Sequence, residues 1–128
     1  MVVHAAAQGR LAVVLDRQSL DRTLFALADP TRRGVIDLLR KRPRKASDLA
    51  DALEITRPAM SRHLRVLRKS GLVREEGDED DARLRIYRLE RAPFDDLEGW
   101  LEEVRAFWND QLASFKSYAE KGGRRGPR

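Results

Sequence analysis

Residues 56–71 read Thr56-Arg57-Pro58-Ala59-Met60-Ser61-Arg62-His63-Leu64-Arg65-Val66-Leu67-Arg68-Lys69-Ser70-Gly71 and carry the signals of a single helix. A threonine can cap a helix start, proline is tolerated in the first turn, and glycine is common just past a helix end. Met60, Leu64 and Leu67 recur at helical spacing and form one apolar stripe. The segment from Thr56 to Ser70 holds five basic residues and no acid. Such a helix suits the DNA major groove, where arginine can form two hydrogen bonds to guanine.

A shorter helix is predicted just before this segment. Ser47 is a candidate N-cap, and Asp48 suits the positive end of a helix dipole. The apolar face of this helix is narrow: Leu49, Ala50 and Leu53. A turn over residues 54–56, which lacks the glycine often found there, leads into the basic helix. The two helices predict a helix-turn-helix, whose second helix enters the groove; taken alone, the basic helix could equally be a solvated surface helix.

Composition bounds the class of protein. A chain of 128 residues suits one domain with a real core, and its net charge of +5 favours an anionic partner. The chain has no cysteine, which excludes disulfides, thiolate metal sites and thiol redox switches. No segment approaches the length of a membrane span, and residues 1–7 lack the pattern of a signal peptide. We therefore expect a cytoplasmic protein without a membrane partner.

The region before the helix-turn-helix predicts two further helices. Residues 1–18 are weakly specified: the apolar run 11–15 could pack across a subunit interface, or the leader could be disordered. Residues 20–28 then show apolar residues at helical spacing. Asp29-Pro30 ends that helix and starts another, with aspartate as cap and proline at the first helical position.

Arg32 and Arg33 fall in the first turn of this second helix, where the helix dipole disfavours cations. We expect their side chains to bind Asp29 or a neighbouring carboxylate rather than a phosphate.

A β-hairpin is predicted after the helix-turn-helix, in the position of a wing. Residues 72–75 read as one strand, and residues 84–89 alternate apolar and polar side chains as a second. Residues 75–81 hold six acids and no base, which phosphate would repel. We expect the tip to point away from DNA and leave Arg83 and Arg85 to approach it; contact of the acids with another partner is the alternative.

A long helix is predicted from Phe94 to about Ala119, introduced by Pro93. It would be about 39 Å long, more than a small winged domain can cover. Pairing with a second copy would cover its surplus apolar stripe and give a twofold dimer; folding back over its own domain is the alternative. The residues assigned to the dimer interface are Leu20, Leu24, Leu101, Val104, Phe107, Trp108, Leu112 and Phe115.

These elements define the expected organisation: a mainly α fold with a small β-hairpin wing. Residues 19–92 form a winged helix-turn-helix, residues 93–119 a long C-terminal dimerisation helix, and residues 120–128 a basic, disordered tail. Residues 1–18 form the leader.

Two runs resemble the ArsR/SmtB family of bacterial transcriptional repressors. They are Leu24-Phe25-Ala26-Leu27-Ala28-Asp29-Pro30-Thr31-Arg32-Arg33 and Ser61-Arg62-His63-Leu64-Arg65-Val66-Leu67-Arg68-Lys69-Ser70-Gly71-Leu72-Val73. The resemblance covers residues 20–119 and implies a homodimer that binds an inverted repeat near a promoter and blocks transcription until released. A small molecule, an accessory protein or no inducer at all would each fit. The closing helix is similar to a subgroup without known metal sites.

The sequence departs from the metal-sensing members of that family. Those members place cysteines in or just before the first helix of the helix-turn-helix, whereas residues 45–49 contain none. Other members use ligands that include histidine on the last helix, which has no histidine here. His4 lies in the leader and His63 in the basic helix, so no metal constellation can be built. We expect no metal response and no cofactor.

The basic helix supplies most of the predicted DNA contacts. Its N-terminal half faces the bases in known complexes, so we assign base-edge contacts there and phosphate contacts to Arg65 and Lys69. Arg68 could pair with an acid of its own chain. His63 is either a partly buried, hydrogen-bonded imidazole or, by the resemblance, a phosphate or base contact. The predicted DNA-binding set is Thr56, Arg57, Pro58, Ser61, Arg62, His63, Arg65, Lys69, Arg83 and Arg85.

Enzyme classes are disfavoured by the residues available. The chain has no cysteine nucleophile, no Ser/His/Asp set with a histidine to spare, and no phosphate-binding glycine loop. The alternative from another class is a winged-helix protein-interaction module that uses the acidic wing and the aromatic last helix. The acid-free basic helix favours double-stranded DNA as the partner.

Overall fold

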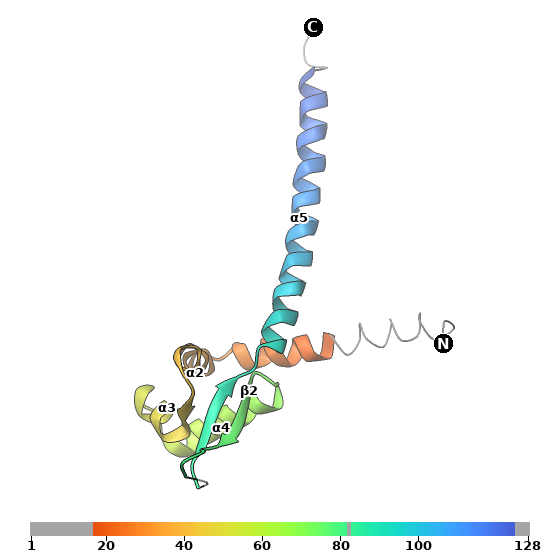
Figure 1. Ribbon diagram of the computed structural model, residues 1–128. Coiled ribbons are helices and arrows are strands. Elements are labelled where there is room, and N and C mark those ends of the chain that lie inside the picture. The colour runs from red at the N-terminus through yellow and green to blue at the C-terminus, as the bar shows by residue number, and fades with distance from the viewer. Residues whose placement is uncertain (1–16, 82, 125–128) are drawn as a thin grey trace, which may run out of the picture. The chain divides into compact units, whose positions relative to one another are not determined.

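The computed structural model describes residues 17–81 and 83–124. The chain forms two compact units that divide between Asp96 and Leu97. The first unit contains a helix over residues 17–27, followed by α2 (Pro30–Lys41), β1 (Arg44–Lys45), α3 (Ala46–Ala52), α4 (Arg57–Lys69), β2 (Val73–Gly77) and β3 (Arg85–Leu89). The last helix, α5 (Ala92–Arg124), has its first five residues in the first unit, and the rest of it forms the second unit (Figure 1). This confirms the predicted fold class, mainly α with a small antiparallel sheet.

The core of the first unit is built around α4, which contacts α2, α3 and β2. Met60, Leu64 and Leu67 are fully buried, as the apolar stripe predicts. Each buried side chain of this size contributes roughly 1.5–3 kcal/mol relative to an exposed one. The other buried apolar residues of the core are Ala26, Val35, Leu39, Leu49, Ala50, Leu72, Val73 and Tyr87.

The sheet has three strands in the order β1-β3-β2, all antiparallel. Pairing of β2 with β3 confirms the predicted hairpin, with Val73 opposite Leu89 and Gly77 opposite Arg85. The two-residue strand β1, which was not predicted, adds to the other edge of β3. Two consecutive basic residues show no alternation, so β1 depends on its pairing partner rather than on a pattern of its own.

The turn between α3 and α4 uses a glutamate where glycine is usual. Glu54 has φ 55°, in the left-handed region. Its N–H donates to the Asp51 carbonyl at 3.2 Å, and the Ile55 N–H donates to the Ala50 carbonyl at 3.1 Å. A tight turn therefore forms without glycine, at a conformational cost to Glu54. At the other end of α4, Gly71 has φ 78° and ends the helix as predicted.

Helix starts confirm two predicted caps and correct a third. The Thr56 hydroxyl accepts the Ala59 N–H at 3.3 Å, and the Asp29 carboxylate accepts the Arg32 N–H at 3.0 Å. The prediction that Ser47 caps α3 is wrong, because α3 begins at Ala46 after Lys45, which makes no side-chain cap. The extended backbone of β1 runs directly into the helix and leaves Ser47 inside the first turn.

The helix α5 is longer at both ends than predicted. It runs from Ala92 to Arg124, 33 residues or about 50 Å. The helix therefore includes residues 120–124 of the predicted tail, although Gly122 and Gly123 are poor helix formers. Residues 125–128 and 1–16 lie outside the described residues, and residues 17 and 18 belong to the first helix. No helix in the described part of the chain is long and apolar enough to span a membrane.

The left-handed Glu54 leads to a stability prediction. Replacing Glu54 with glycine should stabilise the protein by about 0.5–1 kcal/mol, because the left-handed conformation costs other residues ~1–2 kcal/mol and the freedom of unfolded glycine offsets part of the gain. Urea unfolding at equal protein concentration measures the difference. Glu54→Ala, which keeps the strain, is the matched control; a glycine variant no more stable than this alanine variant would contradict the account.

Candidate DNA-binding surface

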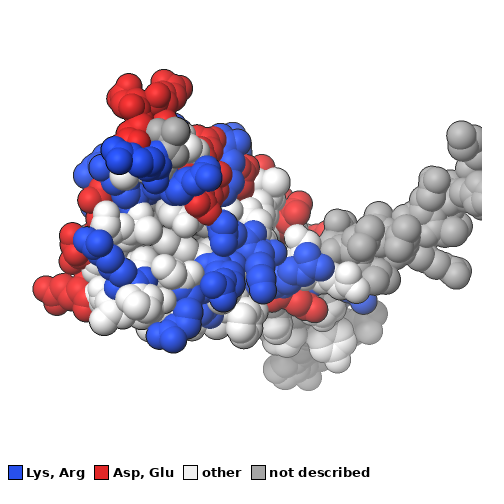
Figure 2. Space-filling view, turned by 90° about the horizontal axis from the view of Figure 1, so that it is seen from below, with Lys and Arg blue, Asp and Glu red and all other residues white. Residues whose placement is uncertain are grey.

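The face of α4 opposite the core is exposed and basic. Because Met60, Leu64 and Leu67 hold the other face in the core, the helix presents a fixed set of side chains to solvent. The exposed set is Thr56, Arg57, Pro58, Ser61, Arg62, Arg65, Arg68 and Lys69. Figure 2 shows Lys and Arg side chains running across this part of the molecule, with acidic side chains gathered at its edges. The residues predicted to contact bases and phosphates on α4 thus share one accessible surface, except for the half-buried His63.

The side chains of Arg32 and Arg33 bind backbone carbonyls, which corrects the expectation that they bind carboxylates. Arg32 Nε donates to the Ala26 carbonyl at 2.7 Å and its Nη2 to the Phe25 carbonyl at 3.1 Å. Arg33 Nη1 donates to the Leu27 carbonyl at 2.8 Å. The last carbonyls of a helix lack intrahelical partners and lie at its negative end, so they attract cations.

These contacts tie the first helix to α2, a structural role that the sequence analysis missed. The available signal was the position of an arginine pair a few residues beyond a helix end.

His63 lies where α4 meets the cap of α2. Its Nδ1 is 3.5 Å from Arg32 Nη1 and 3.8 Å from Asp29 Oδ2, and the side chain is half-buried. The imidazole therefore packs against the side chains of both Arg32 and Asp29. This agrees with the partly buried imidazole considered above; a DNA contact of His63 stays a prediction.

The same junction lowers the pKa of Asp29. The main cause is the hydrogen bond from the Arg32 backbone N–H; burial opposes it, and the charges of Arg32 and His63 add to the lowering.

Glu75 in β2 connects the basic helix to the hairpin. Its carboxylate accepts a hydrogen bond from Arg68 of α4, which confirms that Arg68 pairs within its own chain. On its other side Glu75 Oε1 lies 3.5 Å from Arg85 Nε of β3. Tyr87, also on β3, is buried, and that burial, followed by the Glu75 charge, raises its pKa. The carboxylate thus joins two cations and a buried phenol around one end of α4.

The wing tip is less acidic in effect than its sequence indicates. Glu76 forms ion pairs with Arg74 and Arg88, each at 2.7 Å. Asp81 binds Arg83 at 3.2 Å, and hydrogen bonds from the side chain and backbone of Arg83 lower the Asp81 pKa. Three of the six carboxylates in the acidic run, Glu75, Glu76 and Asp81, are therefore paired with arginines. Arg83 and Arg85, predicted to approach DNA, both form these exposed ion pairs, which exchange partners at small cost.

The second unit exposes a set of large apolar side chains on α5. Among its side chains, Val104 is half-buried and the others predicted for an interface are exposed, Trp108 by 59% and Phe115 by 70%. The Phe107 and Trp108 rings meet edge to face with centroids 5.9 Å apart. Tyr118, three residues beyond Phe115, is also exposed and was missed. In the first unit, Leu20 is half-buried and Leu24 exposed.

The described residues contain no cluster of three or more His, Cys, Asp or Glu side chains that could hold a metal ion.

Comparison with known proteins places these features in one family. Residues 29–75 match the family described as "Bacterial regulatory protein, arsR family". The chain is 33% identical over 106 residues to the HTH-type transcriptional regulator Rv2034 of Mycobacterium tuberculosis, covering 83% of this chain and 94% of the relative. It is 30% identical to the transcriptional repressor SdpR of Bacillus subtilis, covering 64% of this chain and 88% of the relative.

Solved structures agree with this placement. An ArsR-like transcriptional regulator from Rhodococcus sp. RHA1 superimposes with a TM-score of 0.72 at 30% identity, covering 84% of this chain and 96% of that one. The homodimeric winged helix-turn-helix DNA-binding domain of Mb0332 from Mycobacterium bovis, solved by solution NMR, gives a TM-score of 0.56 at 25% identity and covers 80% and 88% of the two chains.

The lowered pKa of Asp29 predicts a pH-dependent contribution to stability. A carboxylate whose pKa is lowered by folding stabilises the fold above its ordinary pKa, and this is lost as pH falls through the lowered value. Asp29→Asn keeps a capping group but removes the charge, so at pH 7 it should cost about 0.3–1 kcal/mol. The cost should shrink between pH 5 and pH 3, as measured by urea unfolding.

Asp29→Ala separates the cap from the charge. This substitution should lower the free energy of unfolding by ~1 kcal/mol over the whole pH range, because alanine cannot accept the capping hydrogen bond at any pH. A difference between the wild type and Asp29→Asn that stays constant from pH 7 to pH 3 would contradict this role of the charge.

Proposed function

This chain belongs to the ArsR family of bacterial transcriptional regulators, and we propose that it is a homodimeric repressor that reads an inverted-repeat operator with α4. The observation that carries the proposal is the exposed, acid-free face of α4, held outward by a buried apolar stripe. Arg57 and Arg62 lie in the N-terminal half of the helix, from which base edges are read. Arg65 and Lys69 lie further along and suit phosphate contacts.

A twofold dimer would place two copies of α4 on two half-sites. The exposed apolar side chains of α5 support pairing with a second copy, since a helix with such a surface needs an apolar partner. The similar domain of Mb0332 is a homodimer. Two recognition helices related by a twofold axis read half-sites about 34 Å apart, one turn of DNA.

Repression without a metal signal is the regulatory mode we propose. The relative SdpR is a transcriptional repressor, and the family resemblance implies blocking of a promoter. The chain lacks cysteine and has only two histidines, His4 and His63, so the donors that a metal-sensing site needs are missing from its sequence.

A binding titration tests the proposed function. Fluorescence anisotropy with a duplex from the region upstream of the protein's own gene, compared with a scrambled duplex, should show tighter binding to the first. The logarithm of affinity should fall steeply with the logarithm of salt concentration because several phosphates are contacted. Failure to bind either this duplex or any duplex selected from a random pool at low salt would refute DNA binding and favour a protein-interaction module.

Replacing Arg62 with alanine should weaken specific binding by roughly 1–3 kcal/mol, the value of a correct arginine–guanine pair. Arg65→Ala should instead weaken binding to all duplexes and reduce the salt slope by about one. Arg40→Ala, an exposed arginine of α2 outside the predicted set, is the control and should bind as the wild type does. Equal affinity of the Arg62→Ala variant and the wild type for the operator would remove Arg62 from base recognition.

Replacing Trp108 with alanine tests the interface assigned to α5. Large aromatic side chains dominate the energy of most interfaces, and their truncation often costs at least ~2 kcal/mol. We expect the dimer to dissociate at low micromolar concentration in sedimentation velocity, while circular dichroism shows a folded chain. Arg105→Ala, on the same helix, should leave the dimer intact. A Trp108→Ala protein that sediments as the wild type does would show that Trp108 is not an anchor.

A further inference from the structure

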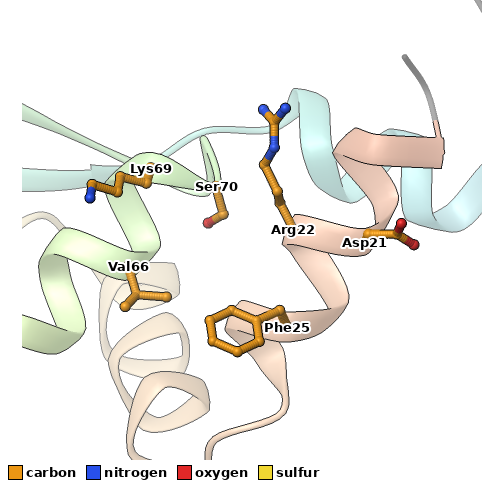
Figure 3. Close-up of a pocket in the computed structure, with 6 residues that line it drawn as sticks. All are labelled: Asp21, Arg22, Phe25, Val66, Lys69 and Ser70. Atoms are coloured by element: carbon orange, nitrogen blue, oxygen red, sulfur yellow. The ribbon is translucent and has the colours of Figure 1, made fainter. Parts of the chain in front are cut away.

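A pocket lies between the first helix and the C-terminal end of α4, apart from the proposed base-reading residues. Its volume is ≈ 320 Å³, at the lower end of the range of about 300–1,000 Å³ typical of small-molecule sites. Residues 21, 22 and 25 line it from the first helix, residues 66 and 69 from α4, and Ser70 from the C-cap that follows α4. Figure 3 shows the Phe25 ring and Val66 on facing sides of one end of this space. The pocket therefore has an apolar floor supplied by two different helices.

The polar groups around this floor favour an anion. In Figure 3 the guanidinium of Arg22 rises at the opposite end from Phe25, whereas the Lys69 ammonium and the Asp21 carboxylate are both directed away from the space. Within the described part of the chain, neither Arg22 nor Lys69 forms an ion pair. The Ser70 hydroxyl donates to the Leu67 carbonyl at 2.8 Å, so its proton is already used.

We propose that this pocket binds an amphipathic carboxylate, with its apolar body between Phe25 and Val66 and its anionic head at Arg22. An aliphatic or aromatic tail matches the apolar floor, and a single negative charge matches the guanidinium at one end of the space. A cationic ligand would be repelled by Arg22, and the Asp21 carboxylate points away from the space.

Occupancy of the pocket would oppose DNA binding. This step rests on the proposed function, in which Lys69 contacts a phosphate. A ligand between Phe25 and Val66 contacts α4 directly and lies beside Lys69, whose side chain lines the pocket, so its presence would shift the group that contacts the phosphate. The two equilibria are therefore linked: the ligand lowers the affinity for DNA, and DNA lowers the affinity for the ligand by the same factor.

The test uses the full chain and decanoate as the probe. Calorimetry without DNA should show one decanoate bound per chain, whereas acetate, which lacks the tail, and decyltrimethylammonium, which has the opposite charge, should not bind. Amide shifts in ¹H–¹⁵N spectra should concentrate at residues 22, 25, 66, 69 and 70. Saturating decanoate should then weaken binding to operator DNA at least about fivefold, the lower end of typical coupling between two sites.

Two variants locate the binding site. Arg22→Gln should weaken decanoate binding about two- to fivefold, as expected for a partly exposed charge pair, and should leave operator binding without decanoate unchanged. Phe25→Ala, at an exposed position, should weaken decanoate binding about tenfold through lost apolar contact. Arg40→Gln removes an exposed arginine of α2 outside the pocket and should behave as the wild type.

The proposal would be overturned by no binding of decanoate, by equal binding of decyltrimethylammonium, or by decanoate binding that neither Arg22→Gln nor Phe25→Ala weakens. Contacts from Phe25 to residues 11–15 or to a second copy, seen as nuclear Overhauser effects in the free protein, would also overturn it by filling the pocket. Calorimetry without DNA tests decanoate binding to the pocket independently of DNA binding. Failure of operator binding in the absence of decanoate would instead refute the proposed function.

Discussion

Burial of Met60, Leu64 and Leu67 fixes the rotation of α4 about its own axis, and the surface of the first unit depends on that rotation. Successive residues of a helix are about 100° apart, so turning α4 by one residue would carry its basic side chains into the core. Burying an unpaired arginine costs several kcal/mol, whereas burying the apolar stripe is favourable. The same constraint therefore sets the core and selects which side chains face a partner.

The neighbours of α4 hold it at both ends. Near its start, His63 lies against Arg32 and Asp29, and Arg32 also binds the carbonyls that end the first helix. At its other end, Arg68 pairs with Glu75 of the hairpin. A change at the first helix or the wing can therefore reach α4 through a single side chain. This gives a ligand at the pocket beside Phe25 and Val66 a physical route to the helix that we propose reads DNA.

The elements with strong local signals could be predicted from the sequence, while features that need a partner in space could not. The stripe of α4, the caps at Asp29 and Thr56, and the glycine end at Gly71 follow from short-range rules, and the structure confirms them. The strand β1 forms only because β3 lies beside it, and it also displaced the expected cap at Ser47.

For the candidate site, the spacing of apolar residues predicted which side chains of α4 are exposed. It did not predict which side chains form ion pairs or hydrogen bonds with one another. The acidic run predicted repulsion of phosphate because three of the four arginines that pair with Glu75 and Glu76 lie on α4 and β3, away from the run in the sequence. Arg32 and Arg33 bind backbone carbonyls. Every residue has a carbonyl, so the only signal in the sequence for these contacts is that a helix ends a few residues earlier. The roles of the exposed α4 residues in DNA recognition remain predictions.

Methylation interference on the bound operator tests most directly that α4 reads the major groove. Methyl groups at guanine N7 lie in the major groove, where arginine would bind, and methyl groups at adenine N3 lie in the minor groove. The account predicts that methylation of guanine N7 abolishes binding in two clusters about one helical turn apart, one for each copy of α4. Interference confined to adenine N3, or absent at every guanine of a tightly bound operator, would contradict it.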